Sequence, residues 1–171
     1  VPDFNENLFF SYQDPLEENI RFSIWNKDDF KKVNTIKNYQ HAIVGHLAQN
    51  IYYRRIQELN ELNQSAFRNS FIYEDQISDL DMYYLFSVIL KQNSILQGIE
   101  DALDVAEQIK RYGFLKSEFD LAKKRHLDHL NQALIEENTR SSEDFIDEYI
   151  NHFIYEEMIT GLAKEIEYTE E

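Results

Sequence analysis

The amino-acid sequence contains no cysteine. Disulfide bonds, thiolate metal ligands and a cysteine nucleophile are therefore excluded. Glycine and proline are also scarce, with only four and two residues in a chain of 171. An all-β sandwich needs more turn residues than this, so we expect long helices to dominate. No run of about 18 apolar residues occurs, and we therefore expect no segment that spans a membrane.

Basic residues are outnumbered, since 17 lysines and arginines stand against 32 acidic residues and give a net charge of −15. Affinity for nucleic acid or for an anionic membrane surface depends on basic residues, so both kinds of partner are disfavoured. Cationic peptides or proteins are the partners that this charge favours. Apolar residues make up 43% of the chain and aromatic residues 14%, which is enough for a folded chain rather than a disordered one. We therefore expect a single domain over residues 1–171.

The spacing of apolar residues predicts a strand, a long helix, a β-hairpin and then several helices. Residues 19–27, NIRFSIWNK, alternate like a half-buried strand, with Ile20, Phe22 and Ile24 on one face. The remaining expected elements are a helix capped by Asn34 or Thr35 and ending near Leu62, strands at 67–77 and 82–91, a helix between Ser94 and Gly113, a helix over 116–137, a helix capped by Ser141 or Ser142, and a further helix within 158–171; residues 8–12 are a candidate extended piece. This order fits an α+β fold, a two-layer sandwich in which long helices pack on one face of an antiparallel sheet.

Two histidines, His126 and His129, lie within the expected helix over 116–137, with Asp128 between them. A helix advances about 100° per residue, so His126 falls within the apolar stripe that contains Phe119, and His129 falls at its edge. Asp128 points to the opposite side, and its carboxylate therefore cannot join both imidazoles around one ion. Two histidines at this spacing can still supply half of a zinc site if a third ligand comes from elsewhere. We expect instead that His126 packs between the helix and the sheet and that His129 lies at the border.

No other motif predicts a catalytic, cofactor-binding or metal-binding residue. His41 and His46 are five residues apart and point away from each other on one helix, and neither H-E-x-x-H nor H-x-x-E-H occurs. A glycine-rich phosphate loop and a G-x-S-x-G motif are absent too. We expect Arg54 and Arg55 to pair with acids, and adjacent carboxylates to lie on solvated faces rather than to act in acid–base catalysis. These carboxylates are Glu17 and Glu18, Asp28 and Asp29, Glu136 and Glu137, and Glu156 and Glu157.

Three separated stretches form a pattern that goes beyond secondary structure. In KRYGFLKSEFDLAKKRHLDHL, a helix ends in GF and the next helix contains an E-x-x-x-A-K core built from Glu118, Ala122 and Lys123. The second stretch is DEYINHF followed by EMITG, and the third is NIYYRRIQEL. Together they resemble the pitrilysin/insulinase family of zinc metallopeptidases, the inverzincins, in the second domain of the amino-terminal half.

The likeness covers about residues 18 to 165 and departs from the family pattern at three positions. Leu115 stands where the family usually has a threonine cap, and Met158 and Thr160 replace two prolines of a turn. These replacements change the local turn chemistry and leave the apolar pattern intact.

The resemblance implies a two-layer domain without catalytic residues. Such a domain packs against the catalytic domain and the carboxy-terminal half of a longer zinc metalloendopeptidase and forms part of the wall of a chamber that takes peptide substrates. In this family the zinc ligands and the general base lie in the first domain, so we expect no cofactor in this segment and zinc in the parent protein. The chain begins VPDFNENLFF, without an initiator methionine, and we expect a fragment. The branch that it resembles implies a periplasmic or exported location.

Two other interpretations stay open. The first is a structural or interaction domain of a catalytically inactive homologue or a partner subunit, which fits the same resemblance because one fold serves many functions. An unrelated acidic helical binding domain would lack the antiparallel sheet. The net charge of −15 either faces the chamber and favours cationic, unfolded peptides or serves solubility alone.

Overall fold

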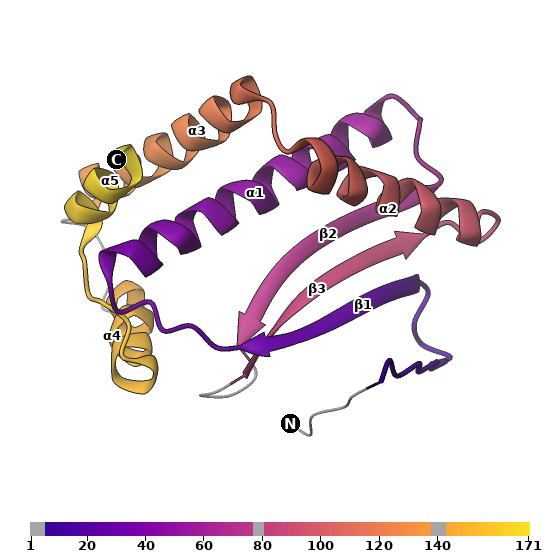
Figure 1. Ribbon diagram of the computed structural model, residues 1–171, viewed down its shortest axis with the longest axis horizontal. Coiled ribbons are helices and arrows are strands. Elements are labelled where there is room, and N and C mark those ends of the chain that lie inside the picture. Colours follow the sequence, from indigo (N-terminus) through magenta and orange to yellow (C-terminus); the bar gives the residue numbers. More distant parts are fainter. Residues whose placement is uncertain (1–5, 77–80, 138–142) are drawn as a thin grey trace.

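The computed structural model describes residues 6–76, 81–137 and 143–171. It confirms the α+β fold class, with an antiparallel sheet and helices on one face of it (Figure 1). The elements in chain order are β1 (Ile20–Asp29), α1 (Ile36–Glu61), β2 (Phe67–Gln76), β3 (Asp81–Leu90), α2 (Ile95–Tyr112), α3 (Lys116–Ile135), α4 (Glu143–Tyr155) and α5 (Leu162–Glu170).

The element boundaries lie close to those expected from the sequence. Thr35 is the cap of α1, because its hydroxyl accepts a hydrogen bond from the Asn38 amide at 3.2 Å. Gly113 ends α2 with φ 70° and ψ −153°, a backbone conformation that is open essentially to glycine alone. Residues 8–12 form no strand, and the expected cap of α4 at Ser141 or Ser142 lies outside the described residues.

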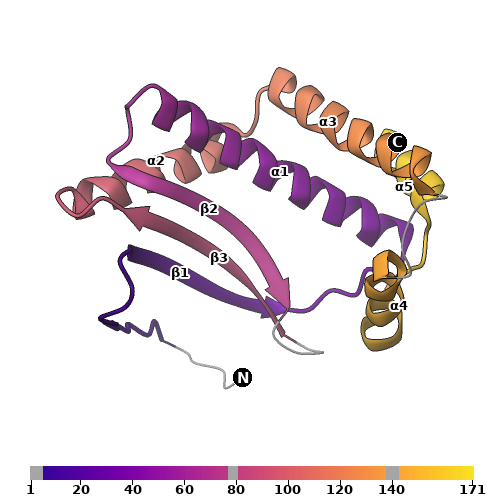
Figure 2. The same cartoon turned by 180° about the vertical axis from the view of Figure 1, so that it is seen from behind.

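The sheet has the strand order β1-β3-β2, so β3 pairs with both neighbours. Ile20 of β1 and Phe67 of β2 both lie opposite Leu90, and the register shifts between Phe67 and Asn69. Strands β1 and β2 therefore run in the same direction and end at the same edge of the molecule, next to α4 (Figures 1 and 2).

The main core fills the space between the sheet and the pair α1 and α2. Its fully buried members include Tyr52 and Ile56 of α1, Phe67 of β2 and Val88 of β3. The Tyr52 hydroxyl is hydrogen-bonded to the Ser70 hydroxyl at 2.7 Å, so its polar atom enters the core with a partner. Burial of these side chains contributes roughly 1.5–3 kcal/mol each and holds α1 on the sheet.

Helix α3 packs on α1 rather than on the sheet. A second apolar cluster joins Leu47 and Ile51 of α1 to Ala122 of α3. The physical reason is the width of the sheet: three strands about 4.8 Å apart span roughly 14 Å, which two helices of about 10 Å diameter already cover. The expected packing of His126 between helix and sheet is therefore wrong, since its helix never reaches the sheet. Within the described parts of the chain, no helix is long and apolar enough to cross a membrane.

Replacing the glycine of α1, Gly45, or that of α2, Gly98, by alanine should have opposite effects on stability. A Cβ at Gly98 would lie 2.9 Å from the Ala66 carbonyl oxygen and 2.9 Å from Leu90 Cδ2, whereas a Cβ at Gly45 would meet only Glu74 Oε1 at 3.6 Å. We expect Gly98→Ala to lower the free energy of unfolding by about 1–3 kcal/mol through overpacking. Gly45→Ala is the matched control and should raise it by up to about 1 kcal/mol through helix propensity. Urea unfolding followed by circular dichroism measures both, and equal signs would contradict this account.

Candidate functional site

The described segments 6–76, 81–137 and 143–171 contain no group of three or more histidine, aspartate or glutamate side chains arranged to hold a metal. His126 faces α1, where its ring lies 5.5 Å from the ring of His46. Burial, followed by the nearby charges of His46 and His129, lowers the pKa of His126. Asp128 is exposed, as the helical spacing predicted, and His129, which was expected at the border of the apolar stripe, is exposed as well. The contact between His46 and His126 joins α1 to α3, and the two histidines are 80 residues apart in sequence (126 minus 46). No pattern in the sequence indicated this contact.

Arg55 and Glu118 form the best-defined charged contact in the structure. The Arg55 guanidinium donates two hydrogen bonds of 2.7 Å to the Glu118 carboxylate, and a longer one of 3.4 Å to the Gly113 carbonyl. Glu118 also accepts from the Leu115 amide at 2.7 Å, so it caps α3 where Leu115 itself has no capping oxygen. Arg55 also lies 5.8 Å from the centre of the Phe114 ring.

This ion pair joins two of the three stretches that carry the family resemblance, NIYYRRIQEL and KSEFDLAKK. The hydrogen bonds that Arg55 donates to Glu118 lower the pKa of the Glu118 carboxyl and raise the pKa of the Arg55 guanidinium. The neighbouring Arg54 pairs instead with Glu58 on the solvent side of α1. The role that the contact indicates is structural: it locks the α2–α3 turn onto α1.

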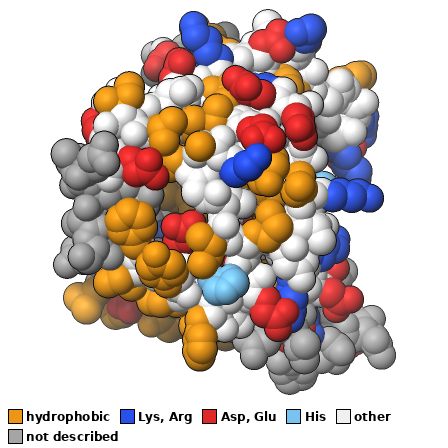
Figure 3. Space-filling model, turned by 90° about the vertical axis from the view of Figure 1, so that its left-hand side faces the viewer, with side chains coloured by type: hydrophobic (Ala, Val, Ile, Leu, Met, Phe, Trp, Pro, Cys, Tyr) orange, Lys and Arg blue, Asp and Glu red, His pale blue; other side chains and the backbone are white. Residues whose placement is uncertain are grey.

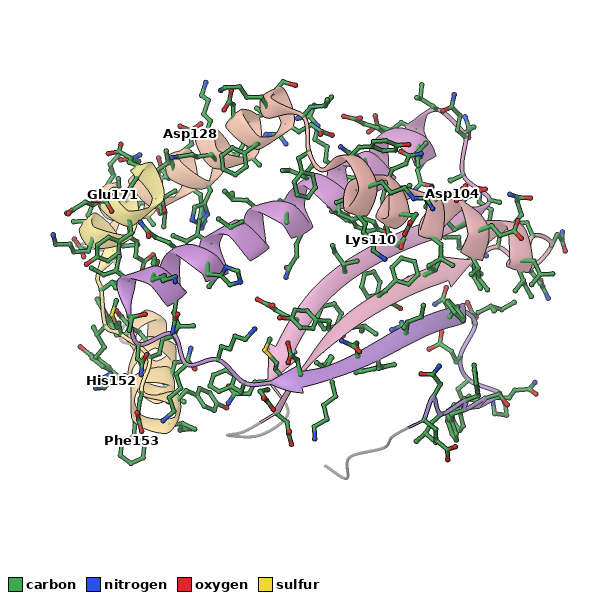
Figure 4. The ribbon with its side chains drawn as sticks, viewed as in Figure 1. Asp104, Lys110, Asp128, His152, Phe153 and Glu171 are labelled. Atoms are coloured by element: carbon green, nitrogen blue, oxygen red, sulfur yellow. The ribbon has the colours of Figure 1, made fainter. Side chains whose placement is uncertain are left out.

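The α4 end of the molecule exposes an apolar surface. Phe153 is 87% exposed, and Figure 4 shows it pointing away from the rest of the chain. Figure 3 looks onto this side and shows hydrophobic side chains gathered around acidic ones. We call this surface the α4 face, and its large exposed members are Ile146, Tyr149, Ile150, Phe153 and Ile154. Exposed apolar groups of this kind are typical of protein–protein contacts, membrane contacts or ligand-binding grooves.

A pocket of about 410 Å³ lies between α4 and the edge at which β1 and β2 end. Its walls include the rings of Phe30 and Tyr155, whose centres are 5.9 Å apart, and the side chains of Asp75, Asn151 and Glu157. The backbone around it is held in place because the Met158 amide donates to the Val33 carbonyl at 3.1 Å and the His152 ring contacts the Glu157 carbonyl at 2.7 Å.

Glu157 corrects one sequence-based expectation. The adjacent carboxylates were expected on solvated faces, and most of those described are exposed, but the side chain of Glu157 is half-buried. Burial raises its pKa, opposed by a hydrogen bond from Asn151 and reinforced by the charges of Glu165 and Glu148. The sequence did not separate Glu157 from Glu156, because only the turn after α4 directs one of the two side chains inward.

The fold is similar to segments of solved proteases. It matches the periplasmic protease PqqL from Escherichia coli with a TM-score of 0.80 and 12% identity, over 89% of this chain and 17% of that one. It matches the first half of the same protease with a TM-score of 0.81 and 12% identity, over 89% of this chain and 32% of that one. A predicted insulinase family protease from Yersinia pestis gives a TM-score of 0.69 and 10% identity, over 88% of this chain and 32% of that one.

At 10–12% identity this likeness shows the fold, and the chain spans 17–32% of the length of these proteins. No family model matches the sequence, and no curated protein matches it either. The fold expected from the family resemblance is therefore present, and it is the fold of a segment of insulinase-family proteases.

The Arg55–Glu118 contact predicts a pH-dependent contribution to stability. We expect Glu118→Gln to lower the free energy of unfolding by about 1–3 kcal/mol at neutral pH, since a charged, double hydrogen bond is lost. Because the pKa of Glu118 is depressed in the folded state, its contribution is present above the usual glutamate pKa and disappears as pH falls through the folded-state value. The difference between wild type and variant should therefore shrink in acid.

The matched control for this prediction is Glu58→Gln, which removes an exposed pair between neighbouring turns of one helix and should cost at most about 0.5 kcal/mol. Chemical denaturation at several pH values measures both variants. A gap between wild type and Glu118→Gln that stays constant from neutral pH to strong acid contradicts the assignment.

Proposed function

We propose that this chain is a non-catalytic domain of a longer zinc metalloendopeptidase, equivalent to the second domain of the amino-terminal half in pitrilysin/insulinase-type enzymes. The observation that carries the proposal is the fold likeness to the first half of a periplasmic protease over 89% of this chain. The sequence resemblance supports it independently, because two of the three stretches that carry it meet in the Arg55–Glu118 contact.

In this role the chain forms part of the wall of a proteolytic chamber. The zinc ion, its ligands and the general base belong to another domain of the parent protein, and the substrate is a peptide or an unfolded protein. A periplasmic or exported location follows from the description of the similar protease as periplasmic. The chain spans only 17–32% of the solved proteases that share its fold, which supports a parent that is longer than this segment.

The α4 face is the surface that we assign to contact with the remainder of the parent. Five large apolar side chains are at least 45% exposed on a helix that stands beside the two layers (Figure 1). A second domain of the same polypeptide is the occupant that fits, because in the proteases of the same fold the matched segment is embedded in a longer chain. Burial of Phe153 alone would contribute roughly 1.5–3 kcal/mol to such an interface.

The chain by itself should bind no zinc stoichiometrically at sub-micromolar concentration. Isothermal titration with Zn²⁺ tests this, and His126→Ala serves as the comparison. Tight binding that disappears in the variant would contradict the proposal, since it would place a metal site in this segment. The nucleotide sequence upstream of this segment is an independent check: an H-x-x-E-H motif with a later glutamate supports the peptidase, and its absence supports a catalytically inactive homologue or partner subunit.

In the full-length parent, α4 should be protected from solvent. We expect amide hydrogen exchange in α4 to slow by at least about tenfold relative to the 171-residue chain, which corresponds to about 1.4 kcal/mol of added local stability. Phe153→Asp in the parent should reverse this protection. Leu96→Asp is the matched control, because Leu96 is a 77% exposed apolar side chain on α2. Unchanged exchange in α4, or an equal effect of both variants, rules out α4 as the docking surface.

A further inference from the structure

The pocket under α4 combines aromatic rings with carboxylates. The rings of Phe30 and Tyr155 have their centres 5.9 Å apart and their planes inclined at 59°. Asp75 and Glu157 line the same pocket. An aromatic ring attracts a cation that lies within about 6 Å of its centre. A carboxylate accepts short, charge-assisted hydrogen bonds from an ammonium or guanidinium group. The lining therefore provides both kinds of interaction that stabilise a positive charge.

The described part of the chain offers these two carboxylates only neutral partners. Asp75 accepts from the Tyr83 hydroxyl at 3.2 Å and from the Gln76 amide at 2.8 Å. Glu157 accepts from the Asn151 side chain.

Lys32, which contacts the turn after α4, already has an acidic partner. Lys32 pairs with Glu156 at 2.9 Å, so its charge compensates the outward-facing member of the adjacent carboxylates. No described cation lies within ion-pair distance of Glu157, the inward-facing member. A ligand that supplies the missing positive charge would complete the pocket.

We propose that this pocket binds the side chain of an arginine or lysine residue in a peptide. Both side chains carry an apolar stem that packs against rings while the charged head reaches polar groups, and the pocket offers the two surfaces together. Its volume of about 410 Å³ lies in the range of about 300–1,000 Å³ that is usual for ligand sites. The proposal goes beyond the proposed function, because it assigns a ligand site to this chain itself, built from residues of this chain alone.

The ionisation of Glu157 agrees with a site that lacks its ligand. The pKa of Glu157 is raised by burial and by the charges of Glu165 of α5 and Glu148 of α4. Burial and the charges of Glu165 and Glu157 also raise the pKa of Tyr39 of α1. Asp75 lies across the pocket. A bound cation stabilises the carboxylate, so binding should lower this pKa and weaken as pH falls through it, at a higher pH than for an ordinary glutamate.

The first test uses acetyl-Gly-Ala-Arg-Ala-Gly-amide as the probe, titrated calorimetrically into the 171-residue chain at neutral pH and low salt. The same peptide with lysine should bind comparably, and the peptide with citrulline, which has the shape of arginine without its charge, should bind at least about tenfold more weakly. Glu157→Gln should weaken the arginine peptide by at least about tenfold, a difference of about 1.4 kcal/mol.

Asp104→Asn is the matched control. It removes one negative charge from an exposed position on α2, away from α4 (Figure 4), and should change the affinity by less than about twofold because Asp104 does not line the pocket. An equal loss in both variants means that the peptide responds only to the net charge of −15, and that result overturns the pocket. Equal binding of arginine and citrulline peptides overturns it as well.

Thermal unfolding of Glu157→Gln separates binding from a structural role. Since the folded state raises the pKa of Glu157, the charged carboxylate destabilises the fold above that pKa, and the neutral amide should raise the melting temperature at neutral pH. A variant that is more stable yet binds less supports a ligand site. A variant that unfolds at lower temperature identifies Glu157 as a structural residue and overturns the proposal.

The source of the side chain is tested with the full-length parent. Binding of the arginine peptide by both the parent and the 171-residue chain supports a peptide bound from solution. Binding by the chain alone shows that a basic residue of the parent fills the pocket, which overturns the peptide as its ligand. The test is independent of the proposed function, because α4 can be protected in the parent whether or not the isolated chain binds the peptide.

Discussion

The packing of α1 on two sides is the constraint on which the rest of this structure depends. Tyr52 and Ile56 bury one side of the helix against the sheet, and Leu47 and Ile51 bury another against α3. A three-stranded sheet has room for about two helices, so α3 and α5 find their place only because α1 offers them a second apolar surface. The Arg55–Glu118 contact extends this arrangement by fixing the turn between α2 and α3 to the same helix.

Because α1 and α2 cover one face of the sheet and α3 and α5 pack on α1, α4 lies beside the layers rather than within them (Figure 1). Its apolar side chains therefore remain exposed, and its first contact with the sheet is through the end of the strands, where Tyr155 meets Phe30. The same placement creates two surface features: the apolar α4 face and the pocket between α4 and the strand ends.

Two glutamates illustrate how environment decides the role of one residue type. Glu118 has a guanidinium partner and a backbone amide, and its pKa is lowered. Glu157 has burial, an asparagine and other carboxylates around it, and its pKa is raised. A carboxylate with a cation partner holds elements together, whereas a buried one without a cation makes the folded state less stable, and carboxylates of this second kind cluster at functional sites. The distinction supports a structural role for the first and a ligand-binding role for the second.

Local sequence pattern determined most of the secondary structure. The alternation in NIRFSIWNK, the aromatic runs on either side of the hairpin and the spacing of three and four along residues 36–61 specify strands and helices through side-chain direction alone. What the pattern could not determine is which helix meets which surface. His126 was expected against the sheet and lies against His46 of α1, and Glu157 was expected in solvent and lies in a pocket. Periodicity reports which face of an element is apolar, but the partner of that face depends on sheet width and on contacts between residues far apart in the chain, which only the tertiary structure decides.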